Sequence, residues 1–159
     1  FNINRTVMKK FGFVLVAFTL IIASCSKGGG STPVTPTPPP VVVAEPDIAF
    51  KVEVDNKEVD YTTYTAALSA AQAVNVNVTT APFPKDGVTI DVTVKKDVDN
   101  SSVFSDAKVG TVAGTNPVTI NNLLPGVPCT ATVLVTSKTL DPVSKTYKSL
   151  SKTFKIARK

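Results

Sequence analysis

The chain has 159 residues, of which 43% are hydrophobic and 18% are charged, and it contains two Cys but no His and no Trp. This length allows one domain with an appendage, and the absence of His removes the commonest general base and the commonest metal ligand. The 17 Lys and Arg residues exceed the 12 Asp and Glu residues by five, but Arg5, Lys9 and Lys10 lie in a segment that we expect to be cleaved. The remaining excess of about two argues against nucleic-acid binding.

Residues 1–24 predict a signal peptide. Lys9 and Lys10 follow Met8 as a cationic n-region, and the next thirteen residues, Phe11 to Ala23, are uncharged and apolar. A helix across a hydrocarbon core of about 30 Å takes about 20 residues, so this run matches the apolar region of a signal peptide instead. Residues 1–7 precede Met8, the expected initiator, and we interpret them as an upstream extension of the reading frame.

The signal peptide ends in Ile22-Ala23-Ser24-Cys25, which resembles the lipobox of bacterial lipoproteins, an aliphatic residue and two small residues before an invariant Cys. The resemblance implies that Cys25 receives a diacylglyceryl thioether and, after cleavage, becomes the acylated first residue. Several acyl chains, at about 0.8 kcal/mol per buried methylene, then hold the protein on a membrane. An ordinary secretory signal, or an anchor helix, with an incidental Cys is the alternative interpretation.

Ser26 bears on the destination of such a lipoprotein. In lipoproteins resembling those of enteric bacteria, Asp after the Cys retains the protein in the inner membrane and Ser does not, so the resemblance implies delivery to the outer membrane. The sequence C-S-K-G-G-G also resembles lipoproteins of Bacteroidota, without the acidic run that often accompanies export to their cell surface. We therefore favour a domain that faces the periplasm over one exposed on the cell surface.

We expect residues 25–46 to comprise the lipidated Cys25 and a flexible Gly-, Pro- and Thr-rich tether. Three glycines, residues 28–30, precede a Pro- and Thr-rich stretch that holds six of the twelve prolines. The glycines provide flexibility, and the prolines favour polyproline II at about 3.1 Å per residue. We interpret this segment as a spacer, the alternative being a proline-rich ligand for a partner with a groove.

From residue 47 to residue 159, apolar side chains recur with a period of two, which predicts β-strands with one buried face. Turn-forming residues, among them Asp55-Asn56 and Asp99-Asn100, separate the runs, and V-E-V-D-N-K-E-V predicts a hairpin centred on Asp55-Asn56. Residues 65–73 alone have a helical composition, which predicts a short helix or a loop. Several short strands without a long helix predict an all-β, antiparallel β-sandwich.

The second half of the chain resembles a fibronectin type III domain. The residues Ile120, Leu123, Pro125-Gly126, Ala131 and Val133 follow the pattern I-x-x-L-x-P-G-x-x-Y-x-V-x-V, which leads from strand E into strand F of that family. The resemblance implies a fibronectin III-like or immunoglobulin-like sandwich, with Leu123 plugging the core and Pro125-Gly126 turning the chain. It also implies strand C at 88–96, strand C′ at 108–112 and strand G at 147–157. Cys129 stands where the family has Tyr.

Candidate catalytic and metal-binding groups are few. Cys129 is expected to be a small buried hydrophobe without a disulfide partner once Cys25 is acylated. With no His in the chain a Cys–His pair is impossible, and we expect no enzymatic activity and no cofactor. The acids near residue 100 (Asp97, Asp99 and Asp106) are interpreted as turn formers, with a Ca²⁺ loop as the alternative, so no metal site is expected.

Charged and aromatic residues supply the remaining candidates. Residues 45–60 carry a net charge of −4 and residues 138–159 a net charge of +6. We expect the two stretches to complement each other across neighbouring first and last strands, the alternative being a basic strip for anionic lipids or an acidic partner. The candidate ligand contacts are four aromatic residues that can be both exposed and fixed: Tyr61, Tyr64, Phe83 and Phe104.

These features predict a membrane-anchored envelope lipoprotein that acts as a non-enzymatic binding or scaffolding module. The partner is another envelope protein or a glycan, and few aromatic rings make the glycan the less favoured one. Outward polar residues offer an uncharged sheet surface for protein contacts: Asn75, Asn77, Thr89, Thr93, Thr130 and Thr132. A purely structural spacer, or an accessory subunit of an envelope or polysaccharide-uptake complex, is the alternative.

Overall fold

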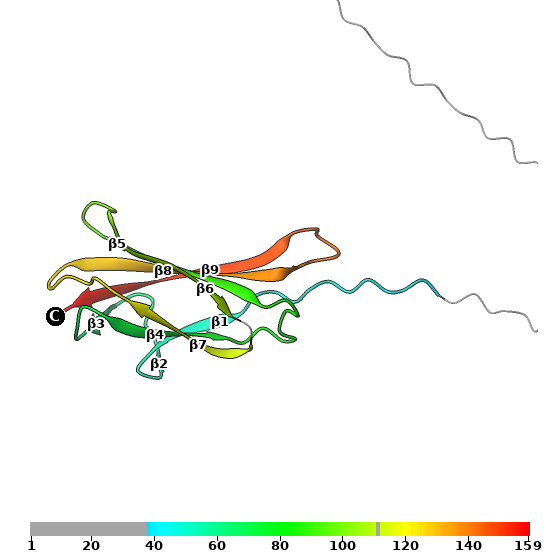
Figure 1. The fold of residues 1–159 in the computed structure, drawn as a ribbon, viewed down its shortest axis with the longest axis horizontal. Coiled ribbons are helices and arrows are strands. Elements are labelled where there is room, and N and C mark those ends of the chain that lie inside the picture. The colour runs from blue at the N-terminus through cyan, green and yellow to red at the C-terminus, as the bar shows by residue number, and fades with distance from the viewer. Residues whose placement is uncertain (1–37, 111) are drawn as a thin grey trace, which may run out of the picture. The chain divides into compact units, whose positions relative to one another are not determined.

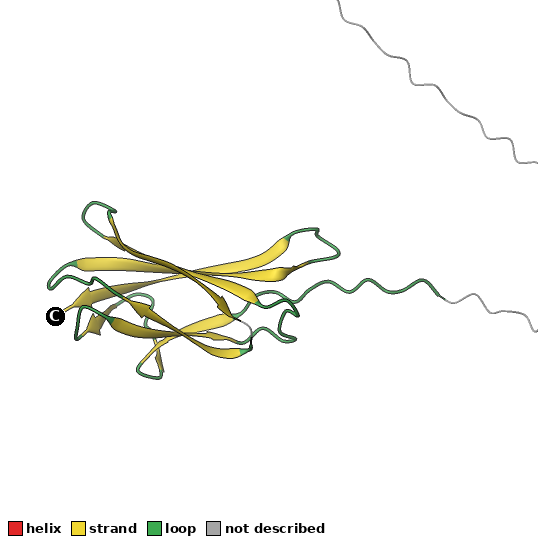
Figure 2. Cartoon of the chain, in the orientation of Figure 1, coloured by secondary structure: helices red, strands yellow, loops and turns green. Residues whose placement is uncertain are grey.

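The computed structural model describes residues 38–110 and 112–159. The predicted signal peptide, Cys25 and the tether up to residue 37 lie outside these residues. The described residues form a four-stranded sheet and a five-stranded sheet that pack on each other as two layers (Figure 1) and contain no helix (Figure 2). The predicted all-β sandwich is therefore confirmed.

The strand order separates the chain into two sets. The four-stranded sheet has the order β2-β1-β4-β7, with β1 at Phe50–Val54, β2 at Lys57–Glu58, β4 at Gln72–Val78 and β7 at Gly114–Ile120. The five-stranded sheet has the order β3-β9-β8-β5-β6, with β3 at Tyr64–Ala67, β5 at Val88–Lys96, β6 at Ser102–Gly110, β8 at Pro128–Leu140 and β9 at Tyr147–Arg158. Neighbouring strands are antiparallel except β3 and β9, which are parallel.

The period-two pattern is the reason for the two layers. Along β5 the side chains of Val88, Ile90, Val92 and Val94 are fully buried, whereas the residues between them are partly exposed. The same alternation along β8 and β4 places a second and a third apolar row between the sheets. Burial of such rows contributes about 25 cal/mol per Å² of apolar surface, so one inward face on each sheet specifies one shared core.

Residues 55–67 confirm one expectation and correct another. Asp55 and Asn56 both have positive φ, 52° and 61°, as a two-residue type I′ hairpin requires, and the predicted hairpin is the β1–β2 hairpin. No helix forms at residues 65–73, and the predicted loop is confined to residues 68–71, because the segment also contains most of β3 and the beginning of β4. Its Ala residues favour a helix locally, but pairing with residues 155–158 of β9 and burial of Ala67 outweigh that preference.

The connection from β7 to β8 agrees with the predicted turn, and one strand position needs correction. Leu123 belongs to the hydrophobic core and is only 1% exposed, and Gly126 turns the chain with a φ of 67°. The strand after β5, expected at residues 108–112, is β6 at Ser102–Gly110. Its position follows from an antiparallel register in which Val88 lies opposite Gly110 and Lys95 lies opposite Ser102.

Candidate functional site

The four aromatic candidates belong to four different segments. Tyr61 lies between β2 and β3, Tyr64 in β3, Phe83 between β4 and β5, and Phe104 in β6. Phe83 and Phe104 are half-buried and pack against the hydrophobic core. Their rings are therefore used largely for packing.

Tyr61 is engaged by the chain on both its hydroxyl and its ring. The hydroxyl accepts a hydrogen bond from the Val52 N–H at 3.4 Å and donates one to Glu58 Oε1 at 3.2 Å. The Lys152 ammonium lies 5.1 Å from the ring centroid. A cation over the ring is a favourable contact, so the structure uses Tyr61 to join the two sheets along one side of the sandwich.

Tyr64 belongs to a set of four residues that we name the Asp97 cluster: Tyr64, Asp97, Thr130 and Lys155. The Asp97 carboxylate accepts hydrogen bonds from the Tyr64 hydroxyl at 2.7 Å, from the Thr130 hydroxyl at 2.6 Å and from the Lys155 ammonium at 2.9 Å. These donors, the Thr130 hydroxyl first among them, lower the pKa of Asp97 to about 2. The cluster ties β3, β8 and β9 to the end of β5, so we assign it a structural role.

The other acids near residue 100 are dispersed. Asp99 accepts a hydrogen bond from the Ser101 N–H at 2.9 Å and so closes its own turn, in which Asn100 has a φ of 57°. Asp106 lies within β6. No group of three or more metal-ligating side chains occurs within the described part of the chain.

Cys129 lies on the inward face of β8 and is 1% exposed. Its thiol donates a hydrogen bond to the Val127 carbonyl at 3.5 Å. Burial raises the pKa of the thiol, which disfavours the nucleophilic thiolate. The prediction of a small buried hydrophobe is confirmed.

The acidic and basic stretches meet where the chain enters the sandwich. The Lys148 ammonium lies 2.8 Å from Asp47 Oδ1 and 3.6 Å from Asp141 Oδ2. Asp141 is buried, and hydrogen bonds from backbone N–H groups, that of Val143 first, lower the pKa of its carboxyl. The expected complementarity of the two stretches is confirmed for this pair, which fixes Asp47 beside the β8–β9 hairpin.

One edge of each sheet, β6 in the five-stranded sheet and β7 in the four-stranded sheet, carries features that oppose pairing with a further strand. In β6, Asp106 and Lys108 lie opposite the buried Val92 and Ile90, so these charged side chains project from the inner side of an edge strand. In β7, Pro117 has no N–H, and its carbonyl accepts a hydrogen bond from the Lys108 ammonium at 2.6 Å. Inward charges and proline are the usual protection of sheet edges, so these two edges are poor sites for strand addition.

The outer face of the five-stranded sheet carries two rows of hydroxyl side chains, separated by a row formed by Asp91, Leu134 and Ser151. The register places Thr89, Thr136 and Ser149 in one row across β5, β8 and β9, and it places Thr93, Thr132 and Thr153 in another. We name this surface the hydroxyl face. Asn75 and Asn77 lie on β4 in the other sheet, so the predicted Thr and Asn rows occupy two different faces of the sandwich.

A hollow of about 300 Å³ lies at one end of the hydroxyl face, lined by Thr89, Thr136, Ser137, Lys138 and Tyr147. Tyr147 is 56% exposed. Unlike Tyr61 and Tyr64, it makes no hydroxyl hydrogen bond to the described residues, and the Lys138 ammonium takes part in none of the ion pairs found among them. We name this site the Tyr147 hollow.

Sequence reasoning did not single out Tyr147, although a signal was present. Counting in steps of two from the inward Phe154 reaches Lys148, so Tyr147 falls on the opposite, outward face with Ser149, Ser151 and Thr153. What the pattern could not show is that the neighbouring strand contributes Lys138 and Thr136 to the same end of the face.

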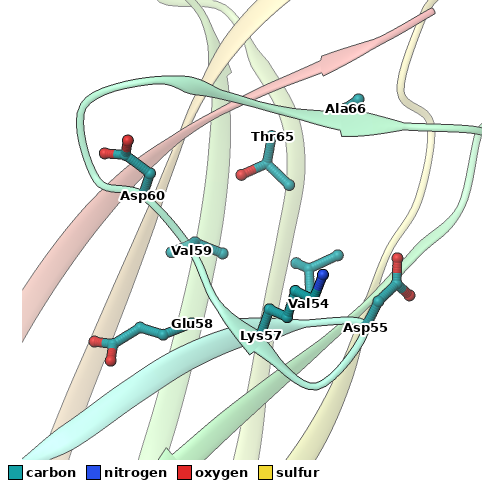
Figure 3. A pocket seen from close by; sticks show the side chains of 8 residues that line it. All are labelled: Val54, Asp55, Lys57, Glu58, Val59, Asp60, Thr65 and Ala66. Atoms are coloured by element: carbon teal, nitrogen blue, oxygen red, sulfur yellow. The ribbon is translucent and has the colours of Figure 1, made fainter.

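A second hollow, of about 390 Å³, lies between the β1–β2 hairpin and β3. Figure 3 shows Asp55 at the opposite end of it from Glu58 and Asp60. The Glu58 carboxylate pairs with Lys51 at 3.3 Å, and Asp60 accepts hydrogen bonds from the Thr62 N–H and hydroxyl. The three acids of this second hollow are dispersed, and two of them, Glu58 and Asp60, are engaged by neighbouring side chains, so the Tyr147 hollow is the better candidate.

Two further findings concern membrane-spanning helices in the described residues and the relation of the chain to known proteins. Within residues 38–110 and 112–159, no helix is both long enough and apolar enough to cross a membrane. Comparison with protein-family models, with curated proteins and with solved structures finds no match to the chain.

Proposed function

We propose that this chain is a lipid-anchored, non-enzymatic binding module of a bacterial envelope. Its fibronectin III-like or immunoglobulin-like sandwich contacts another envelope protein through the hydroxyl face. The anchor is Cys25, delivery is to the outer membrane, and the domain faces the periplasm. The lipobox-like sequence before Cys25 and Ser26 after it support the anchor and the destination.

The strand order supports the type of sandwich. With β1, β4 and β7 taken as strands A, B and E, and with β9, β8, β5 and β6 taken as G, F, C and C′, the strands divide between the sheets as in immunoglobulin-like domains. The short strands β2 and β3 are then an insertion between A and B. The first of the two extends the sheet of strand A, and the second pairs with strand G.

The observation that carries the binding function is the contrast between the edges and the hydroxyl face. Inward charges and Pro117 disfavour strand addition at β6 and β7, whereas the hydroxyl face presents rows of short, uncharged side chains on a rigid sheet. Short hydroxyl side chains lose little conformational freedom when a partner covers them. A face-on protein contact is therefore the mode of binding that this surface favours.

The anchor is tested by Cys25→Ala. This variant should lose metabolic palmitate labelling and leave the membrane fraction, because no other group in the chain is proposed to receive acyl chains. Cys129→Ala is the matched control, since Cys129 is buried and should not affect labelling. Persistent labelling of the Cys25→Ala chain would show that the lipobox interpretation is wrong.

The binding function is tested by photo-crosslinking in cells with the anchored chain. A benzophenone amino acid at Thr132, on the hydroxyl face, should yield one defined crosslinked envelope protein. The same amino acid at Asn75, on the other sheet, is the control and should yield none. Absence of a product from both positions would favour the structural spacer.

The less favoured glycan partner is tested on a glycan array with the detergent-solubilised full chain. We expect no saturable binding, because the structure uses the polar groups of Tyr61 and Tyr64 internally. A saturable signal that disappears in the Tyr61→Ala, Tyr64→Ala double variant would replace the protein partner with a glycan.

A further inference from the structure

The Tyr147 hollow contains the same three kinds of donor that surround Asp97 elsewhere in the sheet. In the Asp97 cluster, a Tyr hydroxyl, a Thr hydroxyl and a Lys ammonium converge on one carboxylate. In the hollow, Tyr147, Thr136 and Lys138 provide these groups, but no carboxylate is among the lining residues. The Asp97 cluster thus shows, within this chain, that a Tyr hydroxyl, a Thr hydroxyl and a Lys ammonium together bind a carboxylate.

The strand register brings these donors to one surface. Thr136 lies opposite both Thr89 of β5 and Ser149 of β9, and Leu140 lies opposite Tyr147. The backbone of Lys138 is held by a hydrogen bond from its N–H to the Gly87 carbonyl at 2.9 Å. The site is therefore built on paired strands, and its side chains start from fixed positions.

The positive charge of the Lys138 ammonium favours a negatively charged ligand. Lys138 pairs with no carboxylate among the described residues, as is also true of Lys145, but Lys138 is the lysine that lines the hollow beside Tyr147 and Thr136. Hydrogen bonds between ionised donors and carboxylates are about twice as strong as neutral ones. A ligand that presents a carboxylate satisfies Lys138 and the two hydroxyl donors at once.

Exposed apolar groups beside the hollow favour a peptide over a sugar acid. Leu140 is 46% exposed and Tyr147 56% exposed, and they form an apolar cross-strand pair. They suit the methylene groups and aliphatic neighbours of a Glu or Asp side chain. The lining has no carboxylate or amide side chain, the groups that commonly bind pairs of sugar hydroxyls.

We infer that the Tyr147 hollow binds a carboxylate side chain from an acidic segment of the partner protein, with Lys138 as the counter-charge and Tyr147 as the apolar and hydroxyl contact. This inference rests on the proposed protein-binding function and names the chemistry of the partner at that surface. It assigns the site to Tyr147, Lys138 and Thr136, of which the sequence marked only Lys138, as part of the basic stretch 138–159.

The defined probe is a fluorescein-labelled peptide with alternating Val and Glu, measured by anisotropy with the full chain in detergent micelles. We expect saturable binding, and we expect the peptide with Gln in place of Glu to bind at least about tenfold more weakly, the worth of one charged hydrogen bond. Lys138→Ala and Tyr147→Ala should each weaken binding about tenfold, whereas Lys138→Arg should retain it. Lys145→Ala, in the turn between β8 and β9, is the matched control and should bind as the wild type does.

Equal binding of the Glu and Gln peptides, or unchanged binding by Lys138→Ala, would overturn the inference. So would an uronate oligosaccharide that binds the hollow while the peptide does not. Circular dichroism of each variant verifies folding, and Tyr147→Phe provides a second variant that keeps the ring.

Crosslinking in cells separates the two proposals. The probe for the hollow is a benzophenone at Ser149, which lies opposite Thr136 and leaves Tyr147 and Lys138 in place. A product from the benzophenone at Thr132 but none from the benzophenone at Ser149 would retain the protein-binding function and reject the hollow as its site. No product from either position would reject both. A product from Ser149 that Lys138→Glu abolishes and Lys145→Glu leaves intact is the expected result.

Discussion

The two ends of the five-stranded sheet carry similar side chains and use them differently. At one end Tyr64, Thr130 and Lys155 surround Asp97, and at the other Tyr147, Thr136 and Lys138 line a hollow without an acid. One carboxylate makes the difference between a closed structural cluster and an open site. Residue types alone therefore do not identify a binding site; what matters is whether the chain itself satisfies them.

The largest effect is expected from Phe154→Ala, which tests whether the two ends depend on one core. Phe154 is 1% exposed on β9, between Tyr147 and Lys155 along the strand. Loss of such a ring costs about 3–5 kcal/mol of unfolding free energy through lost burial and the cavity that remains. Because the chain has no Trp, urea denaturation followed by far-UV circular dichroism is the suitable measurement. A loss below about 1 kcal/mol would contradict the shared core.

Asp97→Ala should make the closed end resemble the open one. It leaves the Tyr64 hydroxyl, the Thr130 hydroxyl and the Lys155 ammonium without their shared acceptor, and we expect a loss of about 1–2 kcal/mol in urea denaturation. Lys138→Ala is the comparison at the open end and should leave the urea midpoint unchanged. Equal effects of the two variants would remove the distinction between the ends.

The closed end should also make stability depend on pH. Because the folded-state pKa of Asp97, about 2, lies below the ordinary value of 3.8, its contribution is present above about pH 4 and is lost as the pH falls towards 2. We expect the wild type to lose about 1 kcal/mol more than Asp97→Asn over this range, since partial exposure screens the interaction. If the unfolding free energies of the two proteins changed in parallel between pH 5 and pH 2, the hydrogen bonds of the cluster would not lower the pKa of Asp97.

The smallest effect compares the two Tyr hydroxyls directly. Tyr64→Phe removes the donor at 2.7 Å from Asp97 and should shift the urea midpoint slightly downward. Tyr147→Phe removes a hydroxyl that bonds to no described residue and should shift it not at all. If Tyr147→Phe lowered the urea midpoint and Tyr64→Phe did not, the structural role would belong to Tyr147 and not to Tyr64.

Much of the fold was predictable because its signal is local. Alternation along β1, β4, β5, β8 and the end of β9 places one face in the core, although Leu150, expected on the inward row of β9, is exposed. The Asp55-Asn56 turn follows from residues that accept positive φ. The inward position of Cys129 follows from the same alternation. The strand β3 was not predictable in this way, because it forms by pairing with residues 155–158, about ninety positions later in the chain.

The candidate site was less predictable than the fold. Tyr61 and Tyr64 are aromatic residues in a polar stretch, and nothing near them in the sequence reveals that Lys152 covers one ring and Asp97 engages the other hydroxyl. For Tyr147 the opposite holds: its hydroxyl has no partner among the described residues because the neighbouring strands place no acceptor beside it. These properties arise from register between distant segments, which a local pattern does not encode.

The sequence by itself determined the all-β class, the inward rows of β1, β4, β5 and β8 and the hairpin at Asp55-Asn56, because burial of one face and turn geometry act over a few residues. Only the tertiary structure decided which polar side chains are satisfied. Asp97 and Lys155 are 58 positions apart, and they meet because the end of β5, β8 and β9 are neighbours. Lys138 remains without a carboxylate among the described residues because the same strand order brings it beside Thr136 and Tyr147 and not beside an acid.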